Sequence, residues 1–473
     1  MSLGRREREQ QATMWIEAAS QATPGGHPFY GRLNALLDKR KFDGFADEAC
    51  RRFYSRTGRP GLAPAVYFRL LLVGYFEGID SERGIAWRAA DSLALRSFLG
   101  YALSDATPDH STISRTRRLI DLETHRNVFG WVLNMLAEEG LLKGSTVAID
   151  GTTLEANAAL RSIVRRDTGE AYDEFLKRLA QESGIETPTR EQLAKLDRRR
   201  PKKGSNDDWE NPHDPDARIT KMKDGRTHLA HKAEHAVDLE TGALLAITLL
   251  PATDGDTTTV HETLAQCGER ICEVAAETNH ERVGERVNPE GPAELVLDKG
   301  YHSNDALVSI GQSGVRTYCS EPNRGRRNWQ GKAEEKAAVY ANRRRIRGNR
   351  GLRLLRQRGE RVERSFAHMY ETGAMRRTHL RHRDNILKRL LIHASAFNLG
   401  LAMRKMTGSG TPRGLSNRLN VFLVGLRLLF AASVSIASDM FAQCVMQSAN
   451  RPDCSFARSR GLSPQKLSCT TGC

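Results

Sequence analysis

The chain has 473 residues, which at roughly 100–200 residues per domain allows two or three domains with a sizeable buried core and excludes a peptide or a disulfide-stapled miniprotein. Lysine and arginine number 72 against 57 aspartate and glutamate, and the resulting net charge of +15 favours a polyanionic partner such as nucleic acid. Hydrophobic residues make up 39% and charged residues 27%, which disfavours both wholesale disorder and a polytopic membrane protein.

Cysteine usage and the first residues bear on the compartment. The eight cysteines are unevenly placed and form no disulfide framework, so a reducing compartment fits best. Cys267 and Cys272 have no second Cys or His pair nearby at zinc-finger spacing, which favours small core residues over a structural zinc site. The start of the chain is charged and polar without the apolar segment of a signal peptide, so secretion is not expected.

The N-terminal part has the periodicity of helices from Gly61 to Ile120, with Pro64 opening one helix and a second running from Arg83 to Leu99. Asp109 then caps a helix that begins at His110 with small polar and basic residues. These residues fit the groove-reading helix of a helix-turn-helix-like DNA-binding motif, and an ordinary bundle with a solvated basic face is the alternative. The expected DNA contacts on this helix are Ser111, Thr112, Arg115, Arg117 and Arg118.

Two predicted strands end in an aspartate. A helix from Glu123 to Glu139 precedes a β-branched run from Ser145 to Ile149, which predicts a buried strand with Asp150 at its tip. A later predicted strand, Glu294 to Leu297, ends at Asp298 in the same way. The two strands therefore each present a carboxylate at one end.

The region between these strands contains a change of composition. From about 160 to 225 the sequence turns polar and rich in charge, and we interpret this segment as an insertion or flexible loop. Two strands follow, His228 to Asp238 and Ala243 to Leu250, with the turn signals of a hairpin between them. A helix is predicted from roughly Thr257 to Thr278, and another after Asp298 from Asn304 to Gln312.

An extremely basic segment follows a short predicted strand, Val315 to Cys319. From Arg343 to Arg364 it holds ten arginines in 22 residues, with Glu360 and Glu363 embedded among them, and a helix is predicted for it. A last amphipathic helix runs from Asn385 to Met403. Further DNA contacts are expected from Lys299, Arg343, Arg344, Arg347, Arg350, Arg356 and Arg364.

The composition shifts again after Met406, where glycines and a proline form a linker. An apolar run from Val421 to Ala437 carries Arg427 near its middle. Because a spanning helix needs about 20 apolar residues and a central arginine is unfavourable in a bilayer, a docking helix or an unpacked tail is favoured over a membrane segment. No membrane partner is expected, and the role of residues 407–473 stays open.

Three acids fit phosphate chemistry: Asp150 and Asp298 at strand ends, and Glu363 among the arginines. Hard divalent cations such as Mg²⁺ bind carboxylate oxygens and usually keep several waters, so two or three carboxylates brought together suffice for a phosphate-processing site. Such a set can hold two ions about 3.5–4 Å apart, one at the attacking and one at the leaving oxygen. Phosphodiester chemistry on DNA is the natural use.

From Phe29 to Met406 the chain resembles the DDE transposases of bacterial insertion sequences. The resemblance is carried, in the family's order, by the helical N-terminal region and by three motifs: Ala148-Ile149-Asp150-Gly151-Thr152, Asp298-Lys299-Gly300-Tyr301, and Val362-Glu363-Arg364-Ser365-Phe366 with Arg376-Arg377 downstream. The resemblance implies an α/β fold with an RNase H-like mixed-sheet catalytic core and a polar insertion, preceded by a helical DNA-binding region. It places these regions at residues 1–140, at 141–406 with the insertion at about 160–225, and in a tail at 407–473.

The resemblance also implies a reaction. Asp150, Asp298 and Glu363 would bind two Mg²⁺ ions, with Mn²⁺ as a substitute, for cleavage at the element's ends and transfer of the freed 3′-hydroxyl into target DNA. The implied partner is double-stranded DNA bound by a homodimer on paired ends, in the bacterial cytoplasm at the nucleoid. Two alternatives stay open: a structure-selective nuclease of the same fold that never joins, and a catalytically decayed DNA-binding protein.

The acidic helix departs from the family's pattern. Gly359 and Tyr370 stand where an arginine and a lysine are expected around the glutamate, which leaves Arg356, Arg364 and Lys299 as substitute phosphate ligands. Glu360 and Glu371 are rivals of Glu363, since an acid among arginines also forms plain surface ion pairs.

Three other patterns favour structure over chemistry. His231 and His235 match an inverted zinc-peptidase motif, but in a strand they would lie about 13 Å apart at 3.3 Å per residue, too far to share a metal ion. Trp209 and Trp329 lie near charged residues, where an aromatic ring can stack on an unpaired base. Ordinary packing is favoured for both, because tryptophan is mostly a buried anchor. Asp256 is interpreted as a turn or loop residue.

Overall fold

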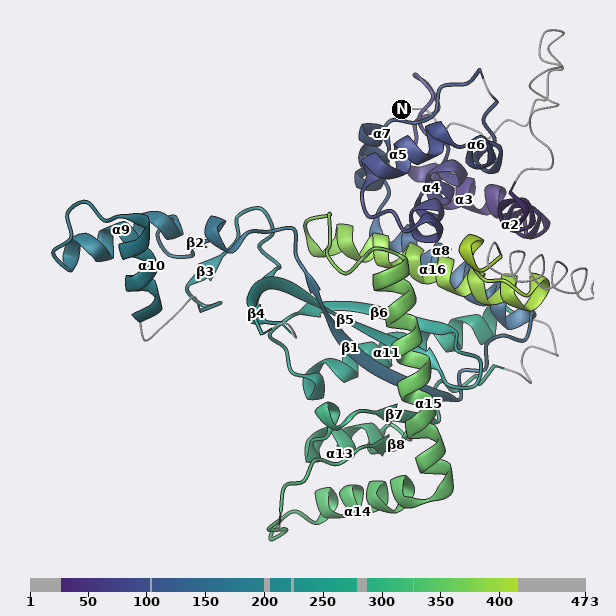
Figure 1. Ribbon diagram of the computed structural model, residues 1–473. Helices are drawn as coiled ribbons and strands as arrows, with labels where there is room; N and C mark the ends of the chain where they lie inside the picture. The colour runs from purple at the N-terminus through teal and green to yellow at the C-terminus, as the bar shows by residue number, and fades with distance from the viewer. Residues whose placement is uncertain are drawn as a thin grey trace, which may run out of the picture. The chain divides into compact units, whose positions relative to one another are not determined.

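The computed structural model describes residues 27–102, 104–199, 205–222, 225–278, 287–325 and 327–415 (Figure 1). The polar start of the chain, the apolar run from Val421 to Ala437 and the four C-terminal cysteines lie outside the described residues. The described residues belong to one compact unit that extends to Leu415. Its main cluster of buried side chains runs from Phe29 to Met403, so the helical N-terminal part and the sheet share a core.

The N-terminal part is helical, as predicted. The predicted helix from Arg83 to Leu99 is two helices, because Ser92 leaves the helical conformation and its hydroxyl accepts the backbone N–H of Leu95 as an N-cap. Asp109 caps the next helix by accepting the N–H of Ser111, which confirms that prediction. The helices are α2 (Pro28–Lys39), α3 (Phe42–Cys50), α4 (Pro64–Glu77), α5 (Glu82–Asp91), α6 (Leu93–Leu99), α7 (His110–Leu119) and α8 (Leu122–Glu138).

A mixed six-stranded sheet follows, and it confirms the α/β class. Its strands are β1 (Thr146–Glu155), β4 (Arg218–Lys221), β5 (Thr227–Asp238), β6 (Leu244–Pro251), β7 (Glu294–Leu297) and β8 (Arg316–Cys319). Strands β1, β7 and β8 are parallel, whereas β5 is antiparallel to β1 on one edge and to β4 and β6 on the other. The predicted hairpin is β5 and β6.

Strand β1 is longer than predicted. It pairs with β7 from Thr146 only as far as Ile149, but it remains paired with β5 up to Glu155. Asp150 is therefore not at a strand tip; it lies where β1 separates from β7 and continues as a partner of β5. The β-branched run ends at Ile149, so composition marks the end of the parallel ladder and not the end of the strand.

The interpretation of residues 160–225 as a flexible loop is wrong over the described part of the segment. It contains η2 (Leu160–Ser162), β2 (Val164–Arg165), α9 (Tyr172–Glu182), α10 (Arg190–Arg199) and β3 (Trp209–Glu210) around a small separate core. Trp209 is buried and meets Tyr172 and Phe175 edge to face. This tryptophan is a packing anchor, as expected.

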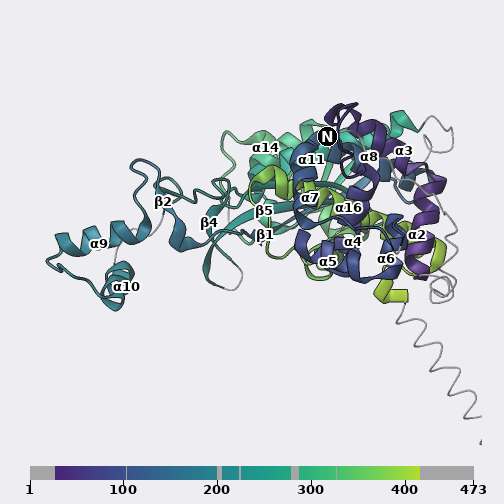
Figure 2. The same ribbon diagram turned by 90° about the horizontal axis from the view of Figure 1, so that it is seen from above.

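Helices cover both faces of the sheet. On one face lies α11 (Asp256–Glu277), whose Thr259 and Thr263 bond to Glu234 of β5. On the other lies α15 (Asn349–Phe366), whose Ser365 bonds to the neighbouring His235. Successive side chains of a strand alternate between faces, so these bonds place the two helices on opposite sides of the sheet, and α15 crosses in front of the strands in Figure 1. Figure 2 shows the same strands from above, with α9 and α10 beyond the β4 side of the sheet.

The basic segment is two helices and not one. The first, α14 (Ala333–Arg347), ends at Gly348, which is extended, and α15 then begins at Asn349. The turn is tight, since a Cβ on Gly351 would lie 2.1 Å from the backbone oxygen of Arg345. After α15 the chain continues into a π-helix, η4 (Ala367–Thr372). The helix α13 (Asn304–Gln312) has the predicted bounds, and β7 does as well.

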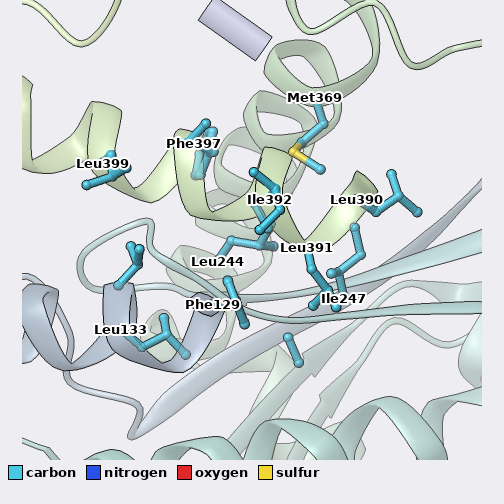
Figure 3. Packing of buried hydrophobic residues seen from close by; sticks show 14 of the residues in the cluster. Phe129, Leu133, Leu244, Ile247, Met369, Leu390, Leu391, Ile392, Phe397 and Leu399 are labelled. Atoms are coloured by element: carbon cyan, nitrogen blue, oxygen red, sulfur yellow. The ribbon is translucent and has the colours of Figure 1, made fainter. Parts of the chain in front are cut away.

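The last helix, α16 (Arg383–Thr407), lies in the core and packs against α8, α4 and β6. Figure 3 shows Leu391 and Ile392 of α16 beside Phe129 of α8 and Ile247 of β6. Within the described residues, the stretch Arg383–Leu415 is long and apolar enough to cross a membrane, but 94% of its apolar window is buried inside the protein. A central core helix has this same signature.

Candidate functional site

The sheet brings Asp150 and Asp298 together. Strands β1 and β7 are parallel, and their last paired residues are Ile149 and Leu297. Asp150 and Asp298 each come directly after this pair, so they occupy the next position on neighbouring strands at the carboxyl end of the ladder. Ligand and catalytic groups of sheets with parallel strands are commonly found at this end.

Arg358 of α15 joins the two carboxylates. Its Nη2 lies 2.5 Å from Oδ2 of Asp150 and 3.6 Å from Oδ2 of Asp298. The other oxygen of each aspartate accepts a backbone N–H, from Gly151 and Lys299 respectively. The guanidinium thus bridges two acids that would otherwise repel each other.

The environment of Asp150 disfavours its charge. Burial raises the pKa of this carboxyl to about 6, and the nearby charges of Asp298 and Asp256 add to the rise. Arg358 and the N–H of Gly151 act in the opposite direction without cancelling the effect of burial. The charged form of a partly buried carboxylate beside a second carboxylate is stabilised by a further positive charge.

A buried polar network lies on the opposite face of β1. Lys232 of β5 pairs with Asp256 at 2.7 Å and with Glu234 at 3.0 Å, and the hydroxyl of Tyr301 donates to Glu234 at 3.0 Å. A Cβ on Gly151 would lie 3.0 Å from the Cε of Lys232, so this network packs directly beneath the Asp150 position.

Asp256 is not the turn or loop residue that the sequence indicated; it is the first residue of α11, half-exposed and paired with Lys232. Its carboxylate lies against Gly300, and its charge reaches Asp150. Asp256, Lys232 and Arg358 are the residues near the two aspartates that sequence reasoning missed. Arg358 carried no signal of its own in the sequence, because it is one of the ten arginines between Arg343 and Arg364.

Glu363, the third predicted acid, lies on the same helix as Arg358. It is exposed, and it comes five residues after Arg358, which at about 100° per residue puts it on a different side of α15 from the bridging guanidinium. Its rivals are also exposed: Glu360 pairs with Arg364, and Glu371 pairs with Arg376.

His235 ties β5 to the end of α15. It lies opposite Asp150 in the β1–β5 register, and its ring bonds to the Ser365 hydroxyl at 2.9 Å and to the Tyr370 hydroxyl at 2.6 Å. Burial lowers the pKa of His235 to about 3, so the ring is neutral. His231 pairs separately with Asp214 at 3.1 Å. Both histidines lie in a strand, as predicted.

The DNA-contact residues predicted on α7 divide into two groups. Arg117 is buried and its Nε donates to Glu82 of α5 at 2.7 Å, so it ties two helices together. Arg115 and Arg118 are exposed, as is Ser111, and Thr112 is half-exposed. The structure therefore leaves four of the five residues at the surface.

The residues predicted on α14 and α15 divide in the same way. Arg343 holds Glu321 with two hydrogen bonds of 2.6 and 2.7 Å, and Arg350 holds the buried Glu294. Arg364 pairs with Glu360 on its own helix. Arg350 is nevertheless exposed itself, as are the predicted residues Lys299, Arg344, Arg347 and Arg356, and Arg353, which was not among the predicted contacts.

Two smaller predictions can be checked here. Cys267 is a buried core residue, but Cys272 is exposed, so the interpretation of both as core residues is wrong for Cys272. Trp329 is partly buried against the core, with Arg327 over its ring at 5.7 Å and Tyr340 edge-on. Packing therefore holds for this tryptophan as well.

Comparison with known proteins adds one match. Residues 17–119 match the family described as a transposase domain (DUF772), a range that includes α2 to α7. The helical N-terminal part of the chain is thus similar to a transposase domain. No curated protein and no solved structure matches the chain. The match supports a transposase of the insertion-sequence type.

Proposed function

We propose that this protein is a transposase of the DDE type, which cleaves DNA strands at the element's ends and transfers the freed 3′-hydroxyl into target DNA. The observation that carries the proposal is the placement of Asp150 and Asp298 at adjacent positions where β1 and β7 cease to pair. The guanidinium of Arg358 bridges the two carboxylates. The mixed sheet with helices on both faces supports an RNase H-like core.

The two aspartates fit a divalent cation. Their oxygens are hard ligands of the kind that Mg²⁺ and Mn²⁺ prefer, and they lie side by side at a half-exposed position. A positive group is already held between them. When bound, the ions would supply Lewis-acid activation of the attacking and leaving oxygens. Asp150 and Asp298 would hold them, and burial of Asp150 would strengthen that attraction.

Glu363 remains the proposed third carboxylate, on the strength of its motif. Glu363 is exposed on α15, and we propose that α15 adjusts when DNA binds so that this carboxylate joins Asp150 and Asp298. The π-helix η4 at the end of α15 is a place where such a rearrangement can start, since π-helical turns are often found at functional sites.

DNA would lie along the exposed side of α14 and α15. Arg344, Arg347, Arg353 and Arg356 are exposed there, and arginine forks suit phosphate groups. The exposed residues of α7 would contribute from the transposase domain. A homodimer on paired ends is part of the proposal by family resemblance.

The test is metal-dependent cleavage and joining of DNA that carries the element's ends, comparing the unmodified chain with Asp150→Asn, Asp298→Asn and Glu363→Gln. Each variant is expected to lose at least about a thousandfold in rate, roughly 4 kcal/mol of transition-state stabilisation, while DNA binding persists. Cleavage without joining would favour the structure-selective nuclease. DNA binding by the unmodified chain with no cleavage in Mg²⁺ or Mn²⁺ would refute the catalytic proposal and favour a decayed element.

A further inference from the structure

Arg358, which bridges the two aspartates, makes fewer hydrogen bonds to its carboxylate partner than other arginines of the basic segment make to theirs. Arg343 and Arg350 each bind one glutamate through Nε and Nη2 together, the two-pronged geometry that carboxylates favour. Arg358 contacts Asp150 through Nη2 alone, at 2.5 Å, and the same nitrogen is the one that lies near Asp298.

The remaining polar atoms of Arg358 make this binding weaker still. Its Nε is buried without a hydrogen-bond partner, and the side chain as a whole is 16% exposed. A buried donor without a partner keeps the penalty of its lost hydration. The guanidinium is therefore held between the carboxylates by charge more than by fitted hydrogen bonds, which is the condition for ready exchange with another cation.

We propose that Arg358 is a positioning residue that occupies the place of a divalent cation between Asp150 and Asp298 and is displaced when that cation binds. The inference rests on the proposed function, because it concerns the same two carboxylates.

Steric overlap and charge repulsion both prevent Arg358 and a divalent cation from occupying the site at the same time. A Mg²⁺ ion lies about 2.0–2.1 Å from its oxygen ligands, so an ion on Oδ2 of Asp150 would need the position that Nη2 now takes at 2.5 Å. The ion would also repel the guanidinium. Arg358 then keeps the two acids paired in the metal-free protein, and it sets the metal concentration at which the site fills.

The experiment measures Mn²⁺ binding to the full chain without DNA, by the electron paramagnetic resonance signal of the free ion. The variant is Arg358→Gln, and the matched control is Arg356→Gln, which removes the same charge from an exposed position two residues away. We expect Arg358→Gln to bind Mn²⁺ about tenfold more tightly, a change of about 1.4 kcal/mol, and Arg356→Gln to stay within about twofold of the unmodified chain.

A second variant guards against loss of folding. Arg358→Lys keeps the charge that competes with the metal ion, so it should bind Mn²⁺ less tightly than Arg358→Gln. Equal or weaker Mn²⁺ binding by the folded Arg358→Gln variant than by the unmodified chain overturns the inference and leaves the proposed function standing. Absence of Mn²⁺ binding in the unmodified chain and in all variants overturns both.

Discussion

The two basic helices α7 and α15 were both predicted to contact DNA, and on both of them some arginines instead bind carboxylates of neighbouring elements. On α7 the inward Arg117 ties the helix to Glu82 within the helical part. On α15 the inward Arg358 and the exposed Arg350 tie the helix to carboxylates of the sheet. The number of arginines on a helix therefore predicts neither DNA binding nor stability. What decides is whether each arginine side chain pairs with a carboxylate of the protein or stays available to a phosphate group.

The largest expected effect on stability is at the inward arginine of α7. Arg117→Ala leaves Glu82 unpaired where both side chains are nearly buried, so we expect a loss of about 3 kcal/mol in unfolding free energy. Denaturant unfolding measures it. Arg118→Ala, on the exposed side of the same helix, is the control and should change stability by less than about 0.5 kcal/mol. Similar losses in both variants would contradict the division of α7.

The second prediction concerns the acid that Arg358 does not fully neutralise. The pKa of Asp150 is raised to about 6 from 3.8, so the folded protein holds a proton on it that the unfolded chain releases between these values. Stability from this group therefore falls as pH rises from about 4 to 6. Asp150→Asn should stabilise the metal-free protein by up to about 3 kcal/mol at pH 7, and by little at pH 4.

Thermal unfolding of the metal-free chain at several pH values measures that difference. A variant that is equally or less stable than the unmodified chain at pH 7 would show that Arg358 compensates the buried charge completely.

The third prediction concerns Arg350, which is exposed itself but holds the buried carboxylate of Glu294. Arg350→Ala should lower the unfolding free energy by about 1–2 kcal/mol, because Glu294 is buried but keeps hydrogen bonds from Thr146 and Tyr318. DNA affinity should change little. Urea unfolding beside a DNA-binding titration separates the two effects, and a large loss of DNA affinity with unchanged stability would reverse the assignment.

The smallest effect on folding is expected on the outward side of α15. The double variant Arg353→Ala, Arg356→Ala should fold as stably as the unmodified chain within about 0.5 kcal/mol. Its DNA affinity should depend less on salt, with the log–log slope reduced by about 0.9 for each phosphate group that the variant no longer neutralises. Fluorescence anisotropy across a salt series gives the slope. An unchanged slope would remove this face from the DNA interface.

The sequence predicted much of the fold where local signals are strong. The bounds of β7 and α13 are as predicted, and the hairpin of β5 and β6 and the cap at Asp109 are confirmed. These elements carry their own markers in composition and turn residues. The core of the insertion was missed, because it depends on packing between residues far apart in sequence, such as Trp209 with Tyr172. The break at Gly348 had a local signal, a glycine inside the predicted helix, that the prediction did not use.

The candidate site was predicted in part. Asp150 and Asp298 were named from strand ends, and their closeness follows from a register that sequence does not display. Glu363 was named from its motif, and its place in the site stays a prediction. Arg358 was not distinguishable, because only the packing of α15 on β1 and β7 selects one arginine of ten.

In the proposal, Asp150 and Asp298 together form a cation site that Arg358 occupies when no metal ion is bound. Anomalous diffraction from crystals soaked in Mn²⁺ tests this arrangement most directly. We expect an anomalous peak between the two carboxylates, with the guanidinium of Arg358 moved away from Asp150. A saturating soak with no peak at this position, and Arg358 still bridging the two aspartates, would contradict it.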